Sequence, residues 1–308
     1  MAYPPIISLR NNNKLEHLGG VSHSDTIVCN ENGYYSEFLS DRYGFNNPDE
    51  EWDKKGKKTY LIGDSFVFGS CVNRPKDIAS NLRLRQSSSI INLGYGGNGP
   101  LLNYATFVEY IENKKNISLI YFFYSGNDLI DLKYEIKKIY LKNYLKKKNY
   151  KKNFIENQKE IDLKIKENIK IKVNQKKNPI FFKDIIFLKN IRRLILGFFF
   201  IKKKTNLLEE KKNFLKIINL INSELQTNKS DLYFVYLPSF NELIQKKNKY
   251  DDLITNLNKN NIHVINLNKE INNYQVDIKT IYAANNELNH FNEIGYKIIS
   301  QILLEKIF

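Results

Sequence analysis

Five short runs of apolar residues, spaced along most of the chain, limit the folds that this sequence can adopt. Each run is rich in Ile, Val, Tyr or Phe and lacks strict alternation with polar residues, the pattern of a strand that is covered on both faces. The runs cover residues 59–65, 89–97, 118–128, 231–239 and 261–268.

Helical patterns separate these runs. They cover residues 66–85, 101–115, 209–226 and 249–260, and a last helix is expected over 293–307 with Asn292 as its N-cap. Strands that alternate with helices predict a parallel sheet with right-handed crossovers and helices on both faces. We therefore expect an α/β fold: a doubly wound, flavodoxin-like parallel sheet of five strands.

Residues 131–206 interrupt this alternation, and a connection of that length predicts an inserted subdomain or lid. Apolar residues four apart, such as Ile136, Tyr140 and Tyr144, predict that it is mainly helical. Residues 133–204 hold 23 Lys or Arg and 6 Asp or Glu, so this insertion accounts for the whole net charge of +15. The lysines can form a solvated face, or, with the basic amphipathic stretch 187–204, a surface for an anionic membrane.

The N-terminal segment, the absence of targeting signals and the two cysteines give further expectations about the chain. Residues 1–56 lack strong periodicity and predict an irregular segment packed on a core domain of residues 57–308. Neither a secretory signal nor a membrane-spanning run is seen, so a cytoplasmic protein is expected, with a peripheral location at a membrane as the alternative. Two cysteines, Cys29 and Cys71, are too few for a disulfide framework, and Cys71 is expected to be a small packed residue without a redox role.

Small and polar residues follow the first three predicted strands. Gly63, Asp64 and Ser65 follow the first; Gly94, Gly96, Gly97 and Asn98 follow the second; Gly126, Asn127 and Asp128 follow the third. The last connection adds Glu287 and His290 in the stretch ELNHFNEIGY. Because ligands bind outside the carboxyl ends of parallel strands, we expect these residues to share one edge of the sheet.

This set of residue types suits acyl transfer. A serine hydroxyl needs an adjacent base, and imidazole has a suitable pKa, so Ser65 is the expected nucleophile and His290 the base. A carboxylate that orients the imidazole is expected from Glu287. The amides of Ser65 and Gly97 and the side-chain amide of Asn127 can form an oxyanion hole, whereas Asp64 is expected to cap a helix and Asp128 to anchor its loop.

The same motifs resemble the sequence blocks of the SGNH hydrolases, also called GDSL esterases and lipases. Gly63-Asp64-Ser65-Phe66 looks like their first block, INLGYGGNG like their second with the oxyanion glycine at Gly97, and SGND like their third with the oxyanion asparagine at Asn127. Glu287 and His290 fall on the final Asp-x-x-His block, with Glu in place of Asp. The resemblance covers about residues 57–130 and 207–308.

The resemblance implies a serine esterase that removes an acyl group, such as acetyl, from a carbohydrate or lipid-like substrate through an acyl-enzyme. Transfer of the acyl group to a glycan hydroxyl is the alternative reaction. An inactive glycan- or membrane-binding module is the alternative from another class. The sequence matches no phosphate-loop or dinucleotide fingerprint, no cluster of metal ligands and no nucleic-acid-binding module, so no cofactor, metal or nucleic acid is expected.

Overall fold

The computed structural model describes residues 14–147, 149–177, 207–285 and 290–308. At its centre is a sheet of five parallel strands in the order β4-β3-β5-β6-β7. These strands are β3 (Lys58–Ile62), β4 (Ser89–Asn92), β5 (Ser118–Tyr124), β6 (Asp231–Leu237) and β7 (His263–Asn266). The order is that of a flavodoxin-like, doubly wound sheet, so the predicted fold class is confirmed.

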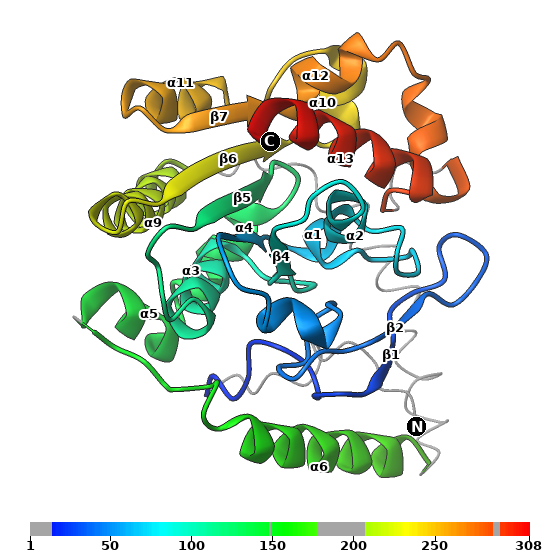
Figure 1. Ribbon diagram of the computed structural model, residues 1–308, viewed down its shortest axis with the longest axis vertical. Helices are drawn as coiled ribbons and strands as arrows, with labels where there is room; N and C mark the ends of the chain where they lie inside the picture. The colour runs from blue at the N-terminus through cyan, green and yellow to red at the C-terminus, as the bar shows by residue number, and fades with distance from the viewer. Residues whose placement is uncertain (1–13, 148, 178–206, 286–289) are drawn as a thin grey trace, which may run out of the picture.

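Helices cover both faces of this sheet (Figure 1). One face packs against α3 (Pro100–Tyr110), α9 (Leu208–Thr227) and α11 (Asp251–Lys259). The other face packs against α1 (Ser65–Phe68), α2 (Ile78–Arg83), α10 (Phe240–Gln245), α12 (Leu267–Asn273) and α13 (Glu293–Ile307). In β5, Tyr121 and Phe123 face the first group of helices, whereas Ile120 and Phe122 face the second. Both faces of the strand are therefore buried, which explains its nearly continuous apolar sequence.

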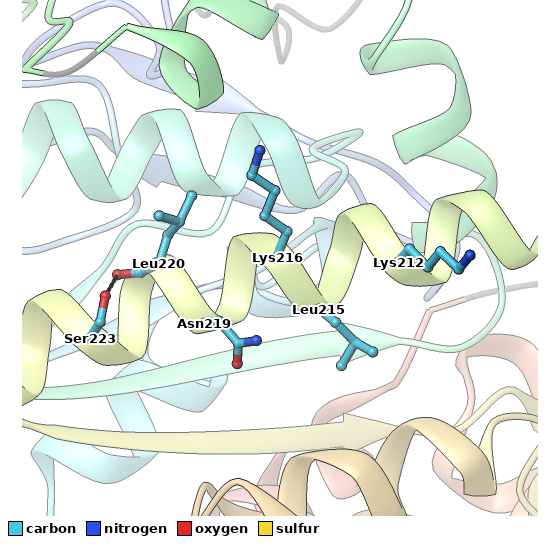
Figure 2. A pocket seen from close by; sticks show the side chains of 6 residues that line it. All are labelled: Lys212, Leu215, Lys216, Asn219, Leu220 and Ser223. Atoms are coloured by element: carbon cyan, nitrogen blue, oxygen red, sulfur yellow. Dashed lines mark hydrogen bonds between the residues drawn. The ribbon is translucent and has the colours of Figure 1, made fainter.

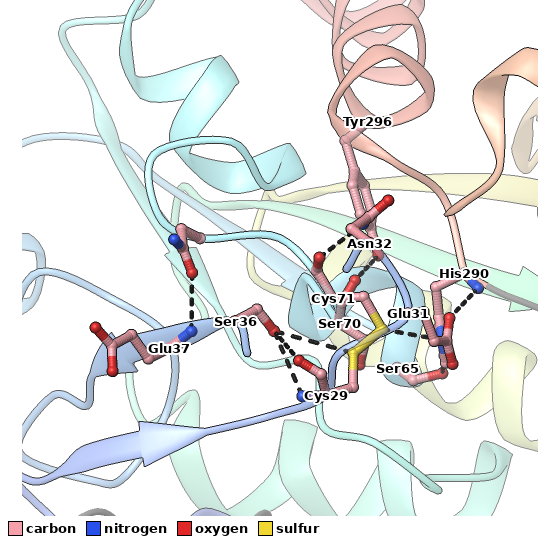
Figure 3. The surroundings of a disulfide bond; sticks show 11 residues. Cys29, Glu31, Asn32, Ser36, Glu37, Ser65, Ser70, Cys71, His290 and Tyr296 are labelled. Carbon is pink, nitrogen blue, oxygen red and sulfur yellow. Dashed lines mark hydrogen bonds and ion pairs between the residues drawn. A yellow bond between two sulfur atoms is a disulfide. The ribbon is translucent and has the colours of Figure 1, made fainter. Parts of the chain in front are cut away.

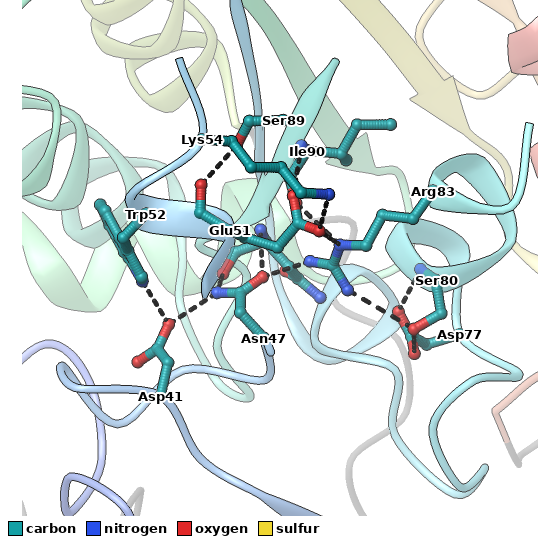
Figure 4. A network of polar contacts seen from close by, with 11 residues as sticks. Asp41, Asn47, Glu51, Trp52, Lys54, Asp77, Ser80, Arg83, Ser89 and Ile90 are labelled. Atoms are coloured by element: carbon teal, nitrogen blue, oxygen red, sulfur yellow. Dashed lines mark hydrogen bonds and ion pairs between the residues drawn. The ribbon is translucent and has the colours of Figure 1, made fainter. Parts of the chain in front are cut away.

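The N-terminal segment forms part of the core and covers one edge of the sheet. It contains the hairpin of β1 (Asp25–Ile27) and β2 (Glu37–Leu39) and the short 3-10 helix η2 (Asp49–Trp52). The outer edge of β4 would otherwise expose unpaired backbone groups. Instead, Asn47 accepts from the amide of Asn92 at 2.8 Å and donates to its carbonyl at 2.9 Å, and Glu51 accepts from the amide of Ile90 at 3.1 Å (Figure 4).

A buried carboxylate holds the Asn47 side chain in place. Asp41 is fully buried and accepts hydrogen bonds from Asn47 Nδ2 and Trp52 Nε1, both at 2.8 Å (Figure 4). Burial raises the pKa of Asp41 although these donors oppose the shift. The charged and polar groups between the segment and the sheet thus form one connected network.

The described part of the insertion is helical, as predicted. It contains α4 (Asp128–Glu135), α5 (Ile139–Lys146) and α6 (Gln158–Lys177). Helix α6 lies against the N-terminal segment, where Asp162 accepts from the amide of Ser22 at 3.0 Å and Gln158 donates to the carbonyl of Gly20 at 3.3 Å (Figure 1). The amphipathic stretch 187–204 lies outside the described residues. Among the described helices, none is long and apolar enough to cross a membrane.

Candidate active site

Ser65 is the first residue of α1, directly beyond the carboxyl end of β3. Asp64 caps this helix by accepting from the amide of Phe66 at 3.0 Å, as the sequence predicted. The turn needs glycine at position 63, because a Cβ there would lie 2.5 Å from Cγ2 of Val67. Ser65 is thereby held half-buried at the edge of the sheet.

His290 reaches Ser65 from the connection that precedes α13. Its Nε2 lies 2.8 Å from Oγ of Ser65, a normal hydrogen-bond distance (Figure 3). The ring packs against Phe66 with 5.0 Å between the ring centroids, and its backbone carbonyl accepts from the amide of Ala283 at 2.8 Å. Asn292 caps α13 by accepting from the amides of Ile294 and Gly295, so the predicted cap is confirmed. The structure thus brings together the two residues that the sequence selected as nucleophile and base.

The carboxylate beside His290 is Glu31, a residue that sequence reasoning missed. Its Oε2 lies 3.0 Å from Nδ1 of His290 and accepts from the backbone amide of His290 at 2.7 Å. Burial alone would raise the pKa of Glu31, but the hydrogen bonds from His290 outweigh it and bring the pKa below the ordinary 4.5. Glu287 lies outside the described residues, so its predicted role as the acid stays a prediction.

Glu31 has no signal in its local sequence. It lies in the loop between β1 and β2, a region that the sequence describes only as irregular, and it is 259 positions away from His290. The contact depends on how the β1-β2 hairpin packs against the sheet domain.

Cys29 and Cys71 form a disulfide beside this site, with 5.1 Å between their Cα atoms (Figure 3). The expectation of Cys71 as an unpaired packed residue was therefore wrong, although its side chain is fully buried. Sequence spacing could not predict the bond, because pairing depends on whether folding brings two Cα atoms close enough. Sγ of Cys71 also lies 3.6 Å from Nδ1 of His290.

The predicted oxyanion donors follow three neighbouring strands, β4, β3 and β5. Gly97 is exposed in the loop after β4 and has a φ of +74°, a conformation that favours glycine. Asn127 is half-buried at the start of α4, but its side chain makes no capping hydrogen bond there. Its buried Oδ1 accepts no hydrogen bond from the described residues.

Three carboxyls lie on the segments that carry Ser65 and Asn127, and two of them, Asp64 and Asp128, are buried. Burial raises the pKa of Asp64 to about 6 and that of Asp131 to about 6. Asp128 anchors its loop, as predicted, by accepting from the amide of Tyr124 at 3.0 Å, and burial together with the nearby Asp64 raises its pKa well above the ordinary value. Protonated carboxyls can remain buried here without the cost of an isolated charge.

Two further features of the described residues are less suited to chemistry. Donor atoms of Cys29, Glu31 and Cys71 lie within 4.8 Å of one another, but sulfurs joined in a disulfide are not the thiolates that bind metals.

A surface depression of about 530 Å³ lies along α9 (Figure 2) and is lined by Lys212, Leu215, Lys216, Asn219, Leu220 and Ser223. None of these is a residue of the Ser65 site, and no imidazole is among them.

Comparisons with known proteins give distant structural similarities. No family model and no curated protein matches this sequence. A lipolytic protein of the G-D-S-L family from Desulfitobacterium hafniense is similar over 82% of this chain and 100% of its own, with 14% identity and a TM-score of 0.46. A Bacillus subtilis protein (11% identity, TM-score 0.46) and an acetyl xylan esterase (13%, 0.45) also match 82% of this chain, covering 56% and 100% of their own lengths.

Proposed function

We propose that this protein is a serine ester hydrolase in which Ser65, His290 and Glu31 form the catalytic triad. The observation that supports it is the continuous chain of contacts from Oγ of Ser65 to Nε2 of His290, and from Nδ1 of His290 to Glu31. The proposal differs from the sequence prediction in the acid, because Glu31 is the carboxylate that lies at Nδ1 of His290 among the described residues.

In this proposal each group has a definite proton position. Nε2 of His290 accepts the hydroxyl proton of Ser65, so the other ring nitrogen, Nδ1, carries a proton and donates to Glu31. The carboxylate holds the ring in this tautomer and stabilises the imidazolium that forms when Ser65 loses its proton. The lowered pKa of Glu31 keeps it ionised for this task.

The reaction follows from these positions. Oγ of Ser65 attacks the acyl carbon while its proton passes to Nε2 of His290. The amides of Ser65 and Gly97 and the side chain of Asn127 bind the developing oxyanion. Collapse of the tetrahedral intermediate expels the alcohol, which takes the proton from His290. Water then attacks the acyl-enzyme in the same way and releases the acid.

The substrate that we propose is an acyl ester, such as acetyl, of a carbohydrate or a lipid-like alcohol. The site requires no cofactor for this reaction, since nucleophile, base and acid all come from the chain. Contact with an anionic membrane through the basic insertion remains a proposal from the sequence.

A fluorophosphonate tests the proposal without a guess about the substrate, since it phosphonylates an activated serine. Intact mass should show one adduct on the wild-type protein, mapped to Ser65 and absent in Ser65→Ala and His290→Ala. Ser223→Ala is the matched control, because Ser223 is an exposed serine on α9 whose hydroxyl donates to the carbonyl of Leu220. An adduct that persists in folded Ser65→Ala, or none on the folded wild-type protein, would refute the proposal.

A further inference from the structure

Glu31 is held in the tip of a hairpin that reaches from the N-terminal segment to the active site. The hairpin tip, residues 28–36, extends the pairing of β1 and β2. The amide of Val28 donates to the carbonyl of Ser36 at 2.8 Å, and the amide of Ser36 donates back to Cys29 at 2.8 Å. A turn closed by the amide of Gly33 and the carbonyl of Asn30, at 3.1 Å, ends the tip.

The hairpin tip is bound to the segment that carries the nucleophile. Besides the Cys29–Cys71 disulfide, Nδ2 of Asn32 donates to the carbonyl of Cys71 at 2.7 Å. Cys71 lies shortly after α1, and the amide of Ser70 donates to the carbonyl of Ser65 at 3.1 Å. The disulfide is therefore the covalent part of the connection between the Glu31 hairpin and the Ser65 turn (Figure 3).

The disulfide also touches the atom that Glu31 must reach. Nδ1 of His290 lies 3.0 Å from Oε2 of Glu31 and 3.6 Å from Sγ of Cys71. Cys29 is half-buried and Cys71 fully buried, so Cys29 is the sulfur that a reductant from solvent can attack. The disulfide therefore lies next to the contact between the carboxylate and the imidazole.

We propose that the Cys29–Cys71 disulfide is a redox-controlled positioning element that holds Glu31 on His290, so that the protein is active when oxidised and loses most of its activity when reduced. This inference rests on the proposed function. Two effects act together on reduction: the hairpin tip loses its covalent tie, and a free Cys71 thiol lies next to the nitrogen that Glu31 binds.

The reductant is a dithiol, and the exchange balances in atoms and electrons. One thiolate of the dithiol attacks Sγ of Cys29 and forms a mixed disulfide, while Cys71 leaves as a thiolate and takes up a proton. The second thiol of the reductant then attacks the reductant sulfur that is bonded to Cys29. This closes the disulfide of the reductant and releases Cys29 as a thiol. The products are two cysteine thiols and one oxidised dithiol. The activity would then depend on the redox state of the compartment that contains the protein, since disulfides persist in oxidising surroundings and are reduced in an ordinary cytosol.

The test measures the rate of fluorophosphonate labelling at Ser65 before and after dithiothreitol, with freed thiols counted by alkylation and mass. We expect reduction to slow labelling by at least about tenfold, and reoxidation to restore the rate. This loss is smaller than the roughly 10²- to 10⁴-fold that a general base contributes, because reduction displaces Glu31 but leaves His290 in place. The Cys29→Ser/Cys71→Ser variant should be labelled slowly at Ser65, and dithiothreitol should not change its labelling rate. Fully reduced protein that labels at the oxidised rate would overturn the proposal.

A second variant separates positioning from general damage. In Glu31→Gln the carboxylate is already absent, so reduction should slow labelling by much less than in the wild type, and reduced wild type should share the pH profile of Glu31→Gln. An equal fold loss in both backgrounds would mean that the disulfide only supports the fold, and the proposal would fail.

Hydrogen exchange of the peptide that covers residues 28–36 measures the protection of the backbone amides in the hairpin tip, and this measurement does not depend on catalytic activity. Reduction should increase exchange at the amides of Gly33 and Ser36, whereas β5 should stay protected. If oxidised wild type gives no Ser65 adduct but exchange rises on reduction, the proposed function fails while the coupling of the disulfide to the hairpin stands. If labelling is normal and exchange is unchanged, the redox proposal fails and the esterase proposal stands.

Discussion

Oε2 of Glu31 lies 3.0 Å from Nδ1 of His290, although 259 positions separate the two residues in the sequence. The same carboxylate oxygen accepts from the backbone amide of His290, so it fixes both the ring and the main chain of this residue. His290 thus meets its nucleophile on one side of the ring and a two-point carboxylate contact on the other.

This contact predicts that Glu31, and not Glu287, supports the base. Replacing Glu31 by Gln removes the charge that stabilises the imidazolium, so kcat should fall by about 100-fold or more. Glu287→Gln is the matched control and should keep wild-type turnover. The measurement is hydrolysis of p-nitrophenyl acetate across a range of pH. A normal rate in Glu31→Gln together with a large loss in Glu287→Gln would reverse the assignment.

The oxyanion hole gives a second prediction, at Asn127. Its side chain neither caps α4 nor has a partner at Oδ1 among the described residues, so Asn127→Ala should change the free energy of unfolding by less than about 0.5 kcal/mol. Loss of one oxyanion donor should nevertheless lower kcat by about 10²- to 10³-fold. KM should change little, because the donor acts mainly in the transition state. Steady-state kinetics and urea unfolding on the same samples test both parts of this prediction. An unchanged kcat would show that Asn127 is not an oxyanion donor.

The fold was predictable because its signals are local. The strand β5 is a continuous apolar run, Asp64 and Asn292 stand where helices begin, and Ser65 directly follows a buried strand. Each of these features needs only a window of a few residues.

Glu31 and the disulfide were not predictable for the opposite reason. Glu31 reaches His290 only after the hairpin tip packs against the segment that follows Ser65, and Cys29 pairs with Cys71 across 42 positions. No spacing rule encodes that approach. The sequence offered Glu287, three positions before His290, and local reasoning preferred the near carboxylate to the distant one.

The covered edge of β4 gives a third prediction. Asn47 accepts from the amide of Asn92 and donates to its carbonyl, and both residues are buried. Asn47→Ala would leave buried backbone groups without partners, which should lower the free energy of unfolding by about 2–3 kcal/mol. Asn258→Ala is the control, since Asn258 is exposed on α11. Urea unfolding compares the two; equal stability of both variants would show that water replaces the Asn47 side chain at this edge.

The buried carboxyl beside the nucleophile gives a prediction for stability against pH. Burial raises the pKa of Asp64 from 3.8 to about 6, so the folded state binds a proton that the unfolded state has already released between these values. The resulting stability is fully present below pH of about 4 and is lost as the pH rises through about 6.

Asp64→Asn keeps an oxygen that can cap α1 but removes the titration. Between pH 4.5 and 7.5 the variant should therefore lose less stability than the wild type, by about 1–3 kcal/mol. Glu156→Gln, at an exposed position in the insertion, should behave as the wild type does. Urea unfolding at the two pH values provides the comparison, and a pH dependence in Asp64→Asn as steep as in the wild type would show that Asp64 is ionised throughout.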